Sequence, residues 1–80
     1  AAGRAAWPAM SNALRALPSV DRLLALPAAA AWLRVYARPW VVEQIRAELE
    51  SARAEIRAGG ATPAEDEIAA RVQARLRAGA

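Results

Sequence analysis

Apolar side chains recur every three or four residues between Arg38 and Gly60, the longest such pattern in the chain. Spacings of 3, 4, 3 and 4 residues place five of them on one helix face: Val42, Ile45, Leu49, Ala52 and Ile56. Arginines repeat in the same rhythm one position further round, at Arg46, Arg53 and Arg57. The pattern predicts one long helix whose apolar stripe is bordered by a guanidinium-rich stripe.

Shorter helices are expected before the long one. Pro18 disfavours helical geometry at the residue before it, and Ser19 is placed to cap a second helical piece through its hydroxyl. Pro27 ends that piece or opens the next, which should stop before Pro39. Trp32 in this third segment is expected to pack in the core.

The last third of the chain predicts one more helix. Gly59 and Gly60 should end the long helix, since glycine adopts the left-handed cap without strain. Thr62 through Glu65 read as a capping box, so a helix should run from Pro63 to about Ala78. No strand pattern appears. The predicted fold is all-α: a small bundle of three to four helices with a long central helix and a C-terminal helical hairpin.

Residues 1–11 are alanine-rich, contain Gly3 and Pro8 and show no sustained period, which predicts a disordered leader. Residues 12–80 are expected to form a single helical domain. The longest apolar run, Leu23 to Leu33, is interrupted by Pro27 and is far shorter than the roughly 20 residues that cross a bilayer. We therefore expect a cytoplasmic protein with no membrane partner.

The amino-acid composition limits the catalytic and binding chemistry that this chain can provide. The 80 residues include no cysteine and no histidine, and all eleven basic residues are arginine against eight carboxylates, for a net charge of +3. The usual general base, thiolate ligands and a Schiff-base lysine are therefore absent from this sequence. We expect no catalytic residue, no metal site and no cofactor within it. Arginine is the one candidate for binding chemistry, because its planar fork suits phosphate oxygens.

Three motifs carry a family resemblance. Residues 17–24 read LPSVDRLL, residues 36–46 read YARPWVVEQIR, and Ala52, Arg53, Ile56 and Arg57 continue them. Together they resemble the opening of bacterial selenocysteine synthase, the L-seryl-tRNA(Sec) selenium transferase, over roughly residues 12–78. Ala37 stands where that family often has glycine, and Trp40 is bulkier than the usual residue there.

The resemblance implies the small N-terminal, tRNA-binding domain of such an enzyme, without catalytic residues of its own. In the family, a separate catalytic domain uses pyridoxal phosphate to convert seryl-tRNA(Sec) to selenocysteinyl-tRNA(Sec), within a large ring-like homo-oligomer. The implied partners are tRNA(Sec), the catalytic domain and neighbouring subunits, and not DNA.

The expected RNA-binding residues are arginines of the long helix and of the resembling motifs: Arg22, Arg38, Arg46, Arg53 and Arg57. Glutamates on the long helix offer a competing interpretation, in which its arginines form a solvated, neutralised face. Arg22 and Arg38 alternatively tie the first helices to the long one through Asp21 or Glu43. Arg71, Arg75 and Arg77 fit dipole stabilisation of an exposed helix end, with RNA contact as the alternative. The competing function is a helical protein-interaction or oligomer-docking module without RNA binding.

Overall fold

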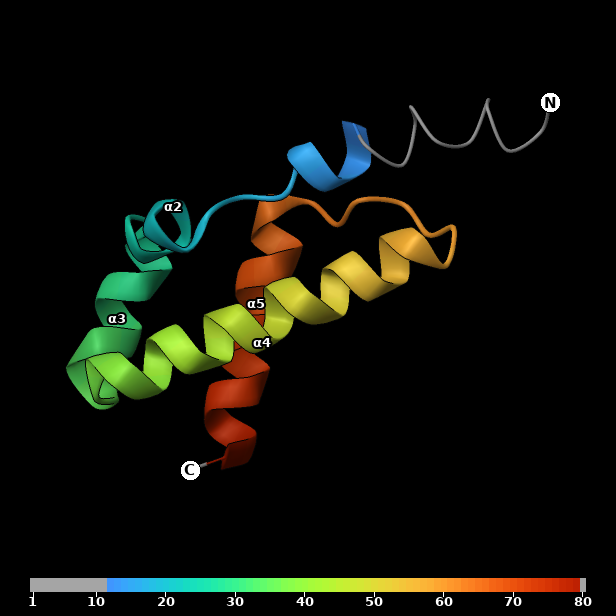
Figure 1. Ribbon diagram of the computed structural model, residues 1–80. Helices are drawn as coiled ribbons and strands as arrows, with labels where there is room; N and C mark the ends of the chain where they lie inside the picture. Colours follow the sequence, from blue (N-terminus) through green and yellow to red (C-terminus); the bar gives the residue numbers. More distant parts are fainter. Residues whose placement is uncertain (1–11, 80) are drawn as a thin grey trace, which may run out of the picture.

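The computed structural model describes residues 12–79, and its regular secondary structure over that range is helical with no strand, as the sequence predicted. A helical turn at residues 12–15 precedes four helices, which are α2 (Val20–Leu24), α3 (Pro27–Val35), α4 (Arg38–Arg57) and α5 (Glu65–Gly79). The 20-residue α4 is the long central helix (Figure 1). The leader predicted for residues 1–11 lies outside the described residues.

The starting residues of α2, α3 and α4 are explained by a capping serine and two prolines. Ser19 is the N-cap of α2, and its hydroxyl accepts a hydrogen bond from the backbone N–H of Arg22 at 3.1 Å. Pro27 opens α3 rather than ending α2, which suits its fixed φ and missing N–H. Pro39 lies in the first turn of α4 for the same reason.

Glycine ends α4 as predicted. Gly59 has φ +99°, the left-handed region that L side chains rarely adopt. This turn lets the N–H of Gly60 donate to the carbonyl of Glu55 at 2.9 Å, which satisfies one of the free carbonyls at the helix end.

The predicted capping box at the start of α5 is wrong. The helix begins at Glu65, two residues later than expected, and Pro63 is buried ahead of it. The hydroxyl of Thr62 donates instead to the carbonyl of Ala13, 49 residues away, at 3.0 Å. A tertiary hydrogen bond that holds the first turn of the domain thus takes the place of the local cap.

Four helices contribute to one core. The stripe of α5 is buried as predicted, with Ile68, Val72 and Leu76 fully inaccessible. On α4 the first core residue is Val41, not Val42, which is only partly buried. Val41 faces the core because α2 and α3 pack against the side of α4 on which it lies. They contribute the remaining buried side chains, Leu23, Ala29 and Trp32.

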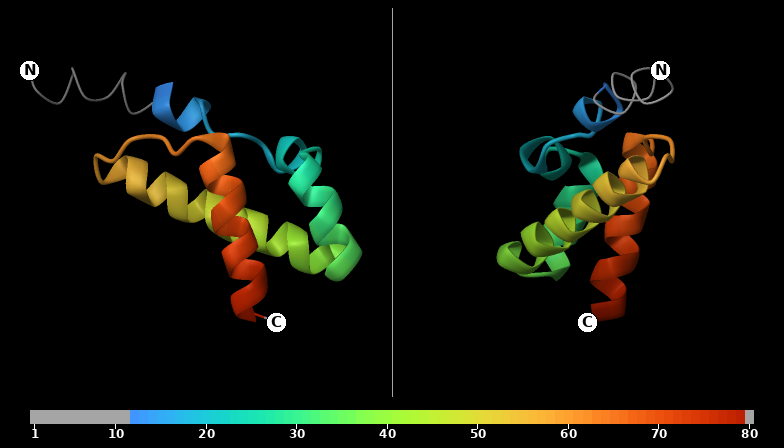
Figure 2. Two further views of the ribbon diagram at one scale, coloured as in Figure 1. Left: turned by 180° about the vertical axis from the view of Figure 1, so that it is seen from behind. Right: turned by 45° about the vertical axis from the view of Figure 1, so that its right-hand side comes forward.

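The helices cross one another. Figures 1 and 2 show α5 passing across α4 at a steep angle after the connection at residues 58–64, while α3 and α5 run side by side in the same direction. The exposed side of α4 and the side formed by α3 and α5 therefore face different ways. No helix in the described part of the chain is long and apolar enough to cross a membrane.

Two valines give a matched test of this core. Val72 is fully buried on α5, whereas Val35 on α3 is 74% exposed. We expect Val72→Ala to lower the free energy of unfolding by about 2 kcal/mol, through lost apolar burial and the cavity left behind. Val35→Ala should change it by less than about 0.5 kcal/mol. Urea unfolding followed by circular dichroism measures both, and equal losses would contradict the packing described.

Candidate nucleic-acid interface

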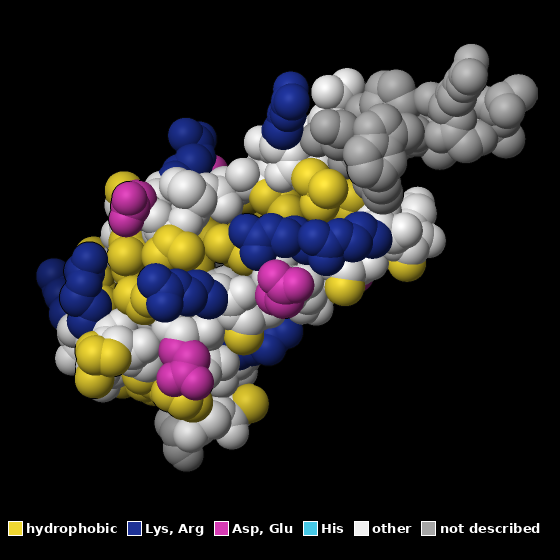
Figure 3. Space-filling model, in the orientation of Figure 1, with side chains coloured by type: hydrophobic (Ala, Val, Ile, Leu, Met, Phe, Trp, Pro, Cys, Tyr) yellow, Lys and Arg dark blue, Asp and Glu magenta, His cyan; other side chains and the backbone are white. Residues whose placement is uncertain are grey.

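Four arginines lie on the exposed side of α4, and we call this surface the α4 arginine face: Arg38, Arg46, Arg53 and Arg57. Arg46, Arg53 and Arg57 are seven and four residues apart, so they lie within a narrow strip of the helix about 17 Å long. Figure 3 shows arginine side chains in a broken row along this side, with acidic side chains between them.

The arginines on this face differ in how far they are neutralised. Among residues 12–79, Arg38 and Arg46 form no ion pair. Glu50 pairs with Arg53 at 3.1 Å and more loosely with Arg57 at 3.9 Å, and all three of these side chains are largely solvated. One carboxylate therefore serves two arginines, and exposed pairs of this kind are weak.

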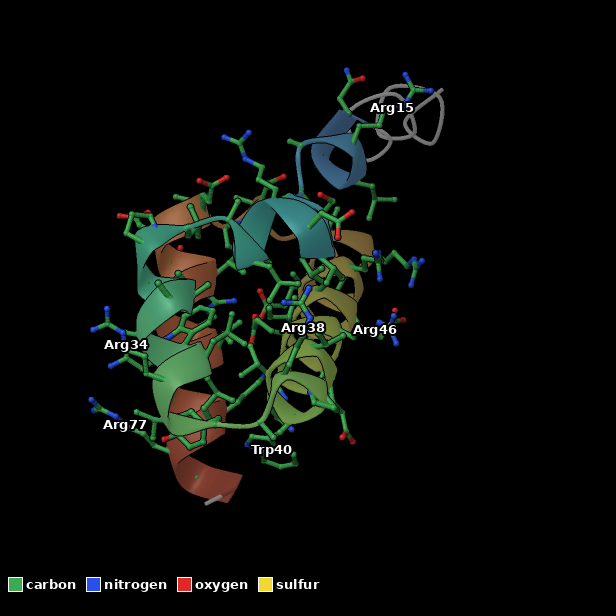
Figure 4. The ribbon with its side chains drawn as sticks, turned by 90° about the vertical axis from the view of Figure 1, so that its left-hand side faces the viewer. Arg15, Arg34, Arg38, Trp40, Arg46 and Arg77 are labelled. Carbon is green, nitrogen blue, oxygen red and sulfur yellow. The ribbon has the colours of Figure 1, made fainter. Side chains whose placement is uncertain are left out.

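A hollow of about 530 Å³ is lined by the two unpaired arginines of this face, Arg38 and Arg46. Pro39, Val42 and Glu43 form the rest of its lining. Figure 4 shows Arg46 projecting from α4 away from α3 and α5. The hollow thus combines two available guanidinium groups with an apolar surface.

Arg22, the fifth expected RNA-binding residue, is on α2 and does not join this face. Its guanidinium donates a hydrogen bond to the carboxylate of Glu65 at the start of α5. That hydrogen bond, followed by the attraction of the two charges, raises the pKa of Arg22 above its usual value. Arg22 does tie two helices together, although through Glu65 and not through Asp21.

The arginines of α5 have a different use, which the sequence reading missed. Glu48 lies on α4 and is only 3% exposed. Its carboxylate accepts a hydrogen bond from Nε of Arg75 at 2.9 Å, and Nη1 of Arg71 lies 3.6 Å from its other oxygen. Arg71 also contacts Glu55 and Glu67, and the hydrogen bond to Glu55 is the main cause that raises its pKa.

A signal for this cluster is present in the sequence. Glu48 falls beside Leu49 within the apolar stripe of α4, where a carboxylate is unexpected unless a cation faces it. Arg71 and Arg75 are four residues apart and so project from one side of α5. They are held against α4 and are not an exposed basic helix end.

The aromatic side chains are mostly enclosed. Trp32 is in the core as predicted, and Tyr36 is partly buried beside it. Trp40 packs against the end of α5 so closely that a Cβ added at Gly79 would collide with its ring. Trp40 therefore positions the C-terminal helix. Trp7 lies outside the described residues.

Comparison with known proteins identifies the family. The sequence model described as "Selenocysteine synthase N terminal" matches residues 14–53, half of the chain. The chain belongs to this family. The selenocysteine synthase match spans α2, α3 and most of α4, and thus includes Arg38, Arg46 and Arg53 of the α4 arginine face.

Curated relatives agree with this assignment. An L-seryl-tRNA(Sec) selenium transferase of Rhizobium meliloti (strain 1021) is 40% identical over 63 residues, which is 79% of this chain and 14% of that protein. A protein of the same name from Methylocella silvestris is 50% identical over 56 residues, or 70% of this chain and 12% of that protein. The chain thus spans about one seventh of their length. No solved structure matches it significantly.

The family resemblance implies a lysine that holds pyridoxal phosphate in the complete enzyme, and this sequence contains no lysine. Within the described residues, no cluster of three or more carboxylates is arranged to hold a metal ion. Arginine supplies all eleven basic side chains of the sequence.

The buried carboxylate yields a stability prediction. Glu48→Gln keeps the shape of the side chain but removes the charge that faces Arg75 and Arg71, so we expect a loss of about 1–3 kcal/mol in unfolding free energy. Glu43→Gln is the matched control on the same helix, because Glu43 is exposed and makes no ion pair among residues 12–79. Similar urea midpoints for the two variants would refute a structural role for Glu48.

Proposed function

We propose that this domain binds tRNA(Sec) through the α4 arginine face. The observation that carries the proposal is the contrast between Arg71 and Arg75 of α5, which face α4, and the arginines of the α4 arginine face. Arg71 and Arg75 of α5 are occupied by Glu48, Glu55 and Glu67. On α4, Arg38 and Arg46 have no carboxylate partner among the described residues, and Arg53 and Arg57 share Glu50.

This arrangement suits a phosphate backbone. Exposed guanidinium groups can exchange water, or a weak partner such as Glu50, for phosphate oxygens with two parallel hydrogen bonds. The strip from Arg46 to Arg57 is about 17 Å long, enough to meet several successive phosphates of a folded RNA. The hollow lined by Arg38 and Arg46 adds an apolar surface against which an exposed loop base can lie.

In the longer enzyme, the proposed role is to hold seryl-tRNA(Sec) while a separate catalytic domain converts it to selenocysteinyl-tRNA(Sec) in the cytoplasm. Both curated relatives carry the name L-seryl-tRNA(Sec) selenium transferase, which supports this substrate. The conversion belongs to a domain with a lysine-bound pyridoxal phosphate, and these residues contribute binding alone. Arg22 has a secondary place in the proposal, because it must release Glu65 before it contacts RNA.

A charge-reversal pair tests the proposal. We expect Arg46→Glu to raise the Kd for tRNA(Sec) about tenfold, since it replaces one phosphate contact by a repulsion. Arg34→Glu changes the net charge equally but lies on the other side of the molecule (Figure 4). At physiological salt, where charges are screened over about 8 Å, it should change the Kd by less than about threefold. Fluorescence anisotropy with labelled tRNA(Sec) measures both constants.

Salt dependence separates phosphate binding from the competing docking module. Log K for the unmodified chain should fall linearly with log salt, by about 0.7–0.9 for each phosphate contact, and Arg46→Ala should reduce that slope by about one contact. The chain should also prefer tRNA(Sec) to other seryl-tRNAs. No binding at low salt, or equal binding to every tRNA, would favour the docking module instead.

A further inference from the structure

A second surface, on the side away from Arg46, has no role in the proposed RNA binding. We call it the α3–α5 groove. Two hollows of about 380 and 320 Å³ lie between α3 and α5, one toward each end of α3, and Gln73 lines both of them. The groove runs from Pro27 near the start of α3 to Tyr36 at its end.

The groove is lined mainly by short, apolar side chains. Alanines from both helices form much of its surface: Ala28, Ala31, Ala69 and Ala70. At one end stands Val35, which is the single large hydrophobic side chain left exposed among residues 12–79. Small side chains let another backbone approach closely, and the nine residues of α3 give the groove a length of about 13 Å. Shape and length suit one amphipathic helix of about three turns.

The charges at the two ends are opposite. Glu65 and Asp66, at the start of α5, line one end. Arg77 lines the other end, and Figure 4 shows Arg34 projecting on the same side of the molecule. Neither Arg34 nor Arg77 forms an ion pair within residues 12–79, whereas Glu65 is engaged by Arg22. The basic end therefore offers the stronger attraction, and it favours a carboxylate.

The helix directions add an independent constraint. Because α3 and α5 run the same way (Figure 2), both present their negative C-terminal ends at the Arg34 and Arg77 end of the groove. A third helix is stabilised there if it runs antiparallel to them, with its positive N-terminal end at that point. An acidic first turn, which favours helix formation by itself, would then face Arg34 and Arg77, and a basic last turn would face Asp66.

From these observations we infer that the α3–α5 groove docks an antiparallel amphipathic protein helix with carboxylates in its first turn, an apolar stripe, and basic residues in its last turn. This site is separate from the α4 arginine face. The domain therefore has room for a protein helix on one side and an RNA on the other.

A designed pair of peptides tests this inference on the full 80-residue chain. One capped peptide of about three helical turns carries glutamates in its first turn, leucines at i, i+3, i+4 and i+7, and arginines in its last turn. The second has the same composition with the glutamates and arginines exchanged. We expect the first to bind with a Kd at least about tenfold lower than the second, by isothermal titration calorimetry.

Matched variants locate the binding. Ala70 lines the groove on α5, and Ala54 is an equally exposed alanine on α4. Ala70→Arg adds bulk and a charge that repels the basic last turn, so it should weaken the first peptide about tenfold or more, whereas Ala54→Arg should leave its Kd within about twofold. Circular dichroism confirms that each variant remains folded, and Val35→Glu provides a second test at a position whose exposure avoids disturbing the core.

Several results would overturn the inference. It fails if both peptides bind equally, if neither binds below millimolar concentration, or if Ala54→Arg is as harmful as Ala70→Arg. It also fails if the chain dimerises and Val35→Glu abolishes the dimer, because a second copy then occupies the groove. Competition between tRNA(Sec) and the peptide would equally contradict it, since the two surfaces would not be separate.

Discussion

The ion pair between Glu48 of α4 and Arg75 of α5 is the interaction on which this structure depends most. A carboxylate that is 3% exposed is costly to bury unless a cation accompanies it, so α5 must cross α4 in the register that brings Arg75 to it. Arg71 reinforces the register by reaching Glu48, Glu55 and Glu67 together. Burial of apolar side chains stabilises the packing of α4 against α5. The buried carboxylate of Glu48 then favours the one register in which Arg75 reaches it.

The Glu48–Arg75 pair also helps to explain why the arginines of α5 and those of α4 differ in their carboxylate partners. Arg71 and Arg75 of α5 face α4 and form ion pairs with Glu55 and Glu48 of that helix. These two glutamates are therefore not available to the arginines of α4. This leaves its own arginines with few partners. Arg46 is without one in the described structure, and Arg53 and Arg57 share Glu50. The unpaired arginines of residues 12–79 are thus distributed unevenly: some lie on the α4 arginine face, where phosphate contact is proposed, and Arg34 and Arg77 lie at one end of the α3–α5 groove.

Local signals in the sequence predicted much of the fold. The Ser19 cap, the glycine end of α4 and the α5 stripe follow from spacing and backbone preference, and the structure has all three. Tertiary contacts decided the rest. Thr62 bonds to Ala13 instead of capping α5, and packing of α2 and α3 selects Val41 rather than Val42 for the core.

The site was less predictable than the fold. Periodicity placed Arg46, Arg53 and Arg57 on one strip of α4, and three motifs were enough to suggest the family to which the chain belongs. Which arginines have carboxylate partners depends on how helices far apart in the sequence meet. The pair between Arg22 and Glu65 spans 43 residues, and no spacing rule predicts it. The burial of Glu48 was not predicted, although a carboxylate within an apolar stripe indicates that a cation faces it.

The most direct test of this account is an NMR titration of the arginine side-chain Nε–Hε signals of the 80-residue chain with tRNA(Sec). The account predicts that Arg38, Arg46, Arg53 and Arg57 shift on addition of RNA, while Arg71 and Arg75 keep their positions because Glu48 still holds them. Shifts confined to Arg71 and Arg75, with the α4 arginine face unchanged, would contradict it.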